Sequence, residues 1–188
     1  MKLRLRLLVM ALLPVIALGV LTYLGASSQI RINIEEQTYT GMLATTLAVR
    51  DVLDSSVEGE YHLDEKGQMW KGDGLNISET PSLVDSIKKE TGFDVTIFYG
   101  NERVLTSIKD ENGNWVGGTQ PLAEINDLVL GKGQNFSDND IEISGKRFMC
   151  FYIPLFQENT STPIGMIFMG KDYKELIEGV GKTQSFML

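Results

Sequence analysis

The sequence predicts an α+β fold in which a long helix precedes a central antiparallel sheet. Two observations carry this prediction. Between residues 29 and 56, apolar side chains recur at steps of three and four, as on one face of a helix. After residue 93, short runs alternate apolar and polar side chains, as on strands, and brief turn sequences separate them. Short turns place consecutive strands antiparallel to one another.

The N-terminal segment predicts a membrane helix. No charged residue occurs from Leu7 to Ile30, and the segment is apolar over most of its length. About 20 such residues are enough to cross a bilayer. Lys2, Arg4 and Arg6 precede the segment, which favours a cytoplasmic N-terminus and an extracellular or periplasmic remainder. We therefore expect a cytoplasmic tip and membrane anchor over residues 1–28, with a cleaved signal peptide as the alternative.

A long helix is expected over residues 29–58, continuing from the membrane segment. Its apolar stripe is interpreted as a face packed on the helix's own domain, with a contact between two copies as the alternative. The stripe consists of Tyr39, Met42, Thr46, Val49 and Leu53.

Short elements are expected over the main domain, residues 59–171, and beyond it. Proline starts and glycine stops predict short helices over 81–91 and 122–130, and a further helix is expected over 172–180. A weak hairpin is expected over 60–73 and an extended piece over 115–119. Alternating patterns predict strands over residues 93–99, 103–108, 140–144, 146–156 and 163–169, the last three as a meander. The long helix should cover one face of this sheet, and the other face is where a small cavity could form.

Composition argues against several classes of function. The net charge of −8 disfavours nucleic acid or an anionic lipid surface as a partner. Cys150 is the only cysteine, so the domain has no intrachain disulfide. His62 is the only histidine and lies in a polar hairpin, without the cluster that a hydrolase triad or a histidine-built metal site requires. We expect no catalytic residue, no metal and no cofactor.

Two strands carry candidate recognition residues. Strict alternation places Arg103, Leu105 and Ser107 on one face of their strand and Val104 with Thr106 on the other. Periodicity leaves two interpretations of Arg103 open: an arginine beside a turn that reaches solvent, or one that waits in a pocket for an anion. On the strand over 146–156, one face carries Phe148, Cys150, Tyr152 and Pro154, and the other carries Met149, Phe151 and Ile153. Tyr152 can cap the core or hydrogen-bond a ligand.

Five sequence runs, in this order, carry a resemblance to a known family. They are GFDVTIFYGNERVLTSI, DENGNWVGGT, GKGQNF, ISGKRFMCFYIPLF and PIGMIFMG. Together they resemble the single Cache extracellular sensor domain, a relative of the PAS fold that bacterial methyl-accepting chemotaxis receptors and some histidine kinases carry. The resemblance covers about residues 29–171. It implies a five-stranded antiparallel sheet with a pocket for a small molecule, often an organic acid.

The resemblance also implies which residues bind the ligand. It places Arg103 and Thr106 on a pocket strand, Tyr152 on its neighbour, and Phe98 and Cys150 beside them. A guanidinium can clamp a carboxylate with two parallel hydrogen bonds. Arg103 and Thr106 can share the pocket only if their strand is bulged or Arg103 belongs to the turn. Thr106 stands where citrate-type relatives carry histidine, which favours a ligand with one acidic group or a neutral metabolite.

We therefore expect an extracytoplasmic sensor for a small metabolite, such as an organic acid, in a transmembrane chemoreceptor that forms a homodimer. Residues 172–188 are expected to lead toward a second membrane span. The alternatives are the input domain of a sensor histidine kinase or diguanylate cyclase, and a membrane-anchored interaction module without a ligand pocket. The module would present an exposed apolar patch and a solvent-facing Arg103.

Overall fold

The computed structural model describes residues 3–110, 112–116 and 120–178. The chain divides into two compact units, residues 1–38 and 39–188, and each is considered by itself. Helix α1 (Leu3–Ser56) runs without a break through the end of the first unit, which confirms that the long helix continues from the apolar segment. Within the described residues, one helix, Met10–Ser56, contains an 18-residue stretch that is apolar enough to cross a membrane.

The second unit is built on a five-stranded antiparallel sheet of order β5-β4-β8-β7-β6, as the sequence predicts. The meander of β6, β7 and β8 is confirmed, and β4 pairs with β8 so that β8 is the central strand. The strands are β4 (Asp94–Tyr99), β5 (Glu102–Thr106), β6 (Phe136–Ile143), β7 (Lys146–Phe156) and β8 (Pro163–Asp172).

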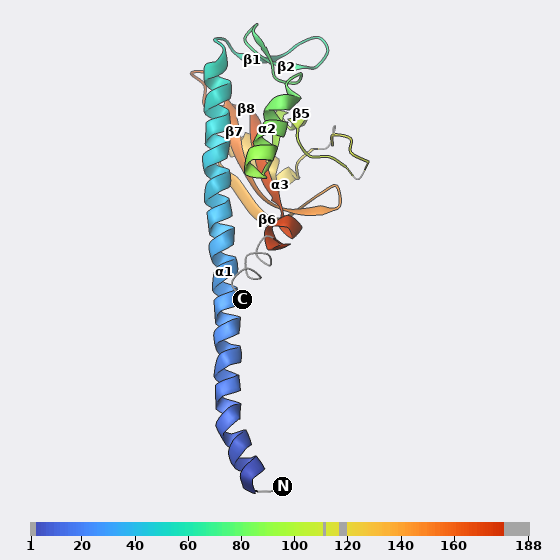
Figure 1. The fold of residues 1–188 in the computed structure, drawn as a ribbon. Helices are drawn as coiled ribbons and strands as arrows, with labels where there is room; N and C mark the ends of the chain where they lie inside the picture. The colour runs from blue at the N-terminus through green and yellow to red at the C-terminus, as the bar shows by residue number, and fades with distance from the viewer. Residues whose placement is uncertain (1–2, 111, 117–119, 179–188) are drawn as a thin grey trace. The chain divides into compact units, whose positions relative to one another are not determined.

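One face of the sheet packs against α1 from Tyr39 onward (Figure 1). The Tyr39 ring meets the Phe151 ring edge-on, with 5.3 Å between the ring centroids. Met42, Thr46 and Leu53 of the same stripe are at most 1% exposed. The interpretation of the stripe as a face packed on its own domain is therefore confirmed.

The opposite face is covered by a short two-part helix, α3 (Ala123–Asn126) followed by a π-helical turn η1 (Asp127–Gly131). The expected helix over 122–130 is thus present, but its second half has the wider π geometry. Ile125 and Val129 point into the core cluster on this face, together with Phe98 and Phe168. This cluster also forms the floor of the candidate site.

Two further elements lie before β4. Helix α2 (Pro81–Thr91) has proline in its first turn and ends at Gly92, whose φ of 72° is the left-handed cap conformation that glycine adopts without strain. The expected hairpin over 60–73 is the start of a three-stranded sheet, β1 (Tyr61–Leu63), β2 (Met69–Lys71) and β3 (Leu75–Asn76). The third strand was not expected because two residues are too short to show alternation.

Three boundaries differ from the expectations. β6 begins at Phe136, because a bulge between Asp138 and Ile141 lets its pairing with β7 continue past polar residues that hid the alternation. β8 continues to Asp172, where residues 173–178 turn helical, and the rest of the expected C-terminal helix lies outside the described residues. Of the extended piece over 115–119, Trp115 forms an isolated bridge with Lys109, and residues 117–119 lie outside the described residues.

Candidate functional site

A β-bulge turns Arg103 toward the face of the sheet that carries the core cluster. Ile97 pairs with Leu105, but Phe98 pairs with Arg103, so Val104 is an extra residue in β5. Thr106 pairs with Thr96, and Thr96 and Phe98 share a face because they are two residues apart. Arg103 and Thr106 therefore lie on the same face, which corrects the strict alternation expected from the sequence and confirms its bulged alternative.

The Arg103 side chain is half-buried, and its guanidinium is only partly satisfied by the protein. Nη1 donates to the Val116 carbonyl at 3.1 Å, and the guanidinium carbon lies 5.5 Å from the centroid of the Phe98 ring. Nε is buried and has no hydrogen-bond partner. Burial lowers the pKa of Arg103 from its ordinary value, with an opposing effect from Tyr152. No carboxylate of the described residues forms an ion pair with this guanidinium.

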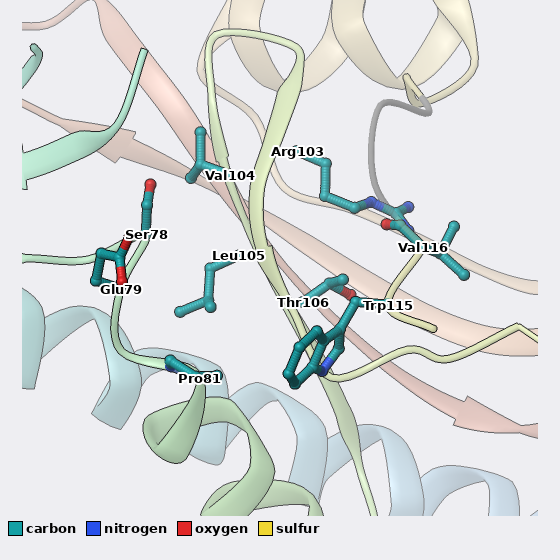
Figure 2. Close-up of a pocket in the computed structure, with 9 residues that line it drawn as sticks. All are labelled: Ser78, Glu79, Pro81, Arg103, Val104, Leu105, Thr106, Trp115 and Val116. Carbon is teal, nitrogen blue, oxygen red and sulfur yellow. The ribbon is translucent and has the colours of Figure 1, made fainter. Parts of the chain in front are cut away.

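Arg103 separates two cavities. The first, which we name the edge groove, lies beside the edge strand β5 and has a volume of about 300 Å³. Figure 2 shows that Val104 and Leu105 point toward Ser78 and Pro81, whereas Arg103 extends the other way, toward Val116. The edge groove is lined by Ser78, Glu79, Pro81, Arg103, Val104, Leu105, Thr106, Trp115 and Val116.

The second cavity, which we name the inner cavity, has a volume of about 140 Å³ and lies on the face covered by α3. Its polar lining residues include Arg103 of β5 and Tyr152 of β7, and isoleucines supply much of its wall. Because β4 and β8 lie between β5 and β7, the expectation that Tyr152 stands on the strand beside that of Arg103 is wrong. It is lined by Arg103, Gln120, Pro121, Leu122, Ile125, Ile141, Glu142, Ile143, Ser144 and Tyr152. The edge groove is the larger of these two cavities, but it is less suitable for an anion than the inner cavity. The reason is that the guanidinium extends away from the Ser78–Pro81 side of the edge groove.

Tyr152 is the second polar group of the inner cavity. The residue is 2% exposed, and its ring packs 6.4 Å from the ring of Phe98. Its hydroxyl is the polar end of a side chain that lines the same cavity as Arg103. Burial raises the pKa of this hydroxyl, Cys150 raises it further, and Arg103 lowers it. The hydroxyl is thus a proton donor at neutral pH that stands close to the guanidinium.

The other three predicted residues lie on the same face, but none of them lines the inner cavity, and only Thr106 lines the edge groove. The Thr106 hydroxyl lies 2.7 Å from the Thr96 hydroxyl and accepts from the Ile108 amide, so its hydrogen bonds are made within the protein. Phe98 lies under the guanidinium. Cys150 is fully buried, and burial raises the pKa of its thiol to about 12. The expected common face of Phe148, Cys150 and Tyr152 is confirmed.

Sequence reasoning missed the residues that close the inner cavity. Leu122, Ile125 and Ile141 were expected only as parts of a helix and a strand. The pattern of β6 contains a usable signal, because Ile141 and Ile143 alternate with Glu142. The Val116 carbonyl, which accepts from Arg103, has no signal in the sequence because every residue carries a carbonyl.

The fold is PAS-like, and comparisons with known proteins give the family. The sequence profile described as single cache domain 3 matches residues 75–183, more than half of the chain. The chain therefore belongs to the single Cache domain family. Its fold is the α+β Cache fold, with a five-stranded antiparallel sheet and a long N-terminal helix.

Two further comparisons concern curated proteins and solved structures. No curated protein matches the chain. One similar solved structure is the sensor domain of DcuS from E. coli, with 12% sequence identity and a TM-score of 0.40 over 54% of this chain and 71% of that chain. A Cache domain is a sensor domain and not a catalytic one, so this domain is not itself an enzyme.

Proposed function

We propose that the chain is the extracytoplasmic sensor part of a transmembrane receptor and binds a small organic acid through Arg103. Cache domains bind small ligands, and the apolar N-terminal helix is suited to anchor the domain in a membrane. The observation that carries the proposal is the half-buried Arg103 guanidinium, which has one protein acceptor and a buried, unpartnered Nε. A buried cation without a counter-charge is costly, and a carboxylate placed against Nε and Nη would remove that cost.

The receptor class follows from the resemblance. We favour a methyl-accepting chemoreceptor, with the input domain of a histidine kinase or diguanylate cyclase as the alternative. An interaction module without a pocket is disfavoured, because it requires a solvent-facing Arg103. We also expect the full-length receptor to be a homodimer, which light scattering of the chain in detergent tests directly.

The test is ligand binding by the whole chain in detergent, measured as a shift in melting temperature and then by calorimetric titration. A panel of small organic acids should contain at least one that raises the melting temperature, because a ligand that binds the native state stabilises it. Arg103→Met should weaken that binding by about 10-fold to 100-fold, the range expected for a charge-assisted bidentate contact.

Arg147→Met is the matched control, because Arg147 is an exposed arginine that pairs with Asp140 outside both cavities. It should leave the affinity unchanged. The proposal fails if no acid stabilises the native chain, or if Arg103→Met binds the active acid as tightly as the native chain does.

A further inference from the structure

The inner cavity is small and partly open to solvent, so its volume bears on the size of the buried part of a ligand. Its volume of about 140 Å³ is close to that of an engineered apolar protein cavity of about 150 Å³ that binds benzene. By this comparison, the inner cavity has room for about six non-hydrogen atoms. A carboxylate group uses three of them, which leaves about three for the rest of the ligand.

The inner cavity offers one charged side chain. Arg103 is its cation, and the other charged residue on its wall, Glu142, belongs to the opposite face of the sheet. Glu142 lies between the inward-facing Ile141 and Ile143 in β6. It is the cross-strand neighbour of Arg147 in β7, whose side chain is exposed. A second carboxylate on the ligand would find no cation among the lining residues, and an ammonium group would find only Glu142, whose exposed side chain belongs to the opposite face of the sheet. Burying either group unpaired is costly.

The rest of the wall is aliphatic. Ile125 is 1% exposed and Ile141 is 8% exposed, and both belong to the core cluster that contains Tyr152. Pro121 and Ile143 also line the cavity, and Leu122, which is 60% exposed, lines it at the protein surface. An alkyl chain that extends from a carboxylate at Arg103 would therefore be buried against apolar side chains, and this burial is favourable for each added methylene until the wall is reached.

We propose that the inner cavity selects an unbranched aliphatic monocarboxylate of three or four carbon atoms, and that Ile125 and Ile141 set the upper limit of chain length. This inference rests on the proposed function, because it takes Arg103 as the carboxylate site. Tyr152 is a second donor for the carboxylate, since its side chain lines the same cavity as Arg103. Chain length is then limited by the isoleucine side chains that line the same cavity.

The experiment is calorimetric titration of the whole chain in detergent with acetate, propionate, butyrate, hexanoate, succinate and alanine. Affinity should rise about fourfold for each methylene from acetate to butyrate, the value expected for burying one methylene group. Hexanoate, succinate and alanine should each bind at least about tenfold more weakly than butyrate, because the first exceeds the volume and the others bury an unpaired charge.

Variants of the wall test the chain-length limit separately. Ile141→Ala should improve hexanoate binding relative to butyrate by about tenfold or more, because the shortened side chain opens the wall. If Ile141→Ala does not fold, the milder Ile141→Val and Ile125→Val should shift the same ratio in the same direction. Ile153→Val is the control, because Ile153 is buried on the other face of the sheet, and it should leave the ratio unchanged.

The results distinguish the two proposals. If succinate or alanine binds as tightly as butyrate and Arg103→Met abolishes that binding, the inference on chain length and charge is wrong while the proposed function stands. The inference is also overturned if the ratio of the affinities for hexanoate and butyrate is unchanged in the folded Ile141 and Ile125 variants. If none of these six compounds binds the native chain but another small organic acid does, this inference alone is wrong, and if no small organic acid binds, both proposals fail.

Discussion

Phe98 and Arg103 are direct cross-strand neighbours, with the guanidinium carbon 5.5 Å from the ring centroid, because Val104 is an extra residue in β5. The contact joins a fully buried aromatic ring to the cation that separates the two cavities. A guanidinium over an aromatic face is attracted by the ring quadrupole, and the attraction grows when water is excluded. Phe98 therefore restrains the guanidinium beside the inner cavity.

The first prediction concerns this contact. Phe98→Leu should weaken binding of the active acid by about 2-fold to 30-fold, the equivalent of a cation–π contact of about 0.5–2 kcal/mol. Phe151→Leu removes an equally buried ring from the opposite face, where Tyr39 contacts it, and should leave affinity unchanged. Calorimetric titration of both variants measures the difference. Equal losses of affinity in the two variants would show that Phe98 acts only through general packing.

The second prediction concerns a buried carboxylate between α2 and the sheet. Asp94 accepts hydrogen bonds from the Lys88 ammonium at 2.7 Å and from the Ser107 hydroxyl at 2.8 Å, and its side chain is 8% exposed. Asp94→Asn should lower the free energy of unfolding by about 1–3 kcal/mol, because a charge-assisted pair with a buried partner is lost. Thermal melting followed by tryptophan fluorescence measures this change.

Asp140→Asn is the control for Asp94. Asp140 pairs with Arg147 at 2.6 Å, but both side chains are more than half exposed, at 62% and 57%. Its loss should cost less than about 1 kcal/mol, since solvent screens exposed ion pairs. The assignment of Asp94 as a structural anion is contradicted if the two variants melt at the same temperature.

The third prediction concerns Gly165, where β8 passes close to β4. A Cβ atom at this position would collide with the Phe98 backbone carbonyl, and a backbone group cannot move aside as a side chain can. Gly165→Ala should therefore cost more than about 4 kcal/mol or prevent folding. Gly131→Ala should change stability by less than about 1 kcal/mol, because its Cβ would meet only the Asn126 carbonyl oxygen at 3.9 Å. Yield of folded protein and melting temperature compare the two.

The fourth prediction concerns Cys150. Because burial raises the pKa of its thiol to about 12, the native protein should not react with a thiol reagent at pH 8, whereas the protein unfolded in urea should react fully. The stability effect has a definite sign. The folded state keeps its proton to a higher pH than the unfolded state, so stability is unaffected below pH 8 and falls as pH rises toward 12. Rapid labelling of the native protein at pH 8 would contradict this assignment.

The sequence by itself determined the elements and much of their packing. Alternation along β7 correctly separated the face of Phe148 and Tyr152 from the face of Phe151, because side chains on a regular strand alternate strictly. Helical periodicity correctly assigned the stripe from Tyr39 to Leu53 to the core. Both patterns are local, so they could be recognised without knowing which elements are neighbours.

The tertiary structure alone decided the geometry of the site. The bulge at Val104 depends on how β5 pairs with β4, and it changed the face that Arg103 shares with Thr106. The burial of Nε and its lack of a partner depend on Val116 and on elements far along the chain. The volume of the inner cavity depends on how closely Ile125 of α3 approaches Ile141 of β6. Distances between segments remote in sequence leave no periodic signal, and these distances give Arg103 its environment.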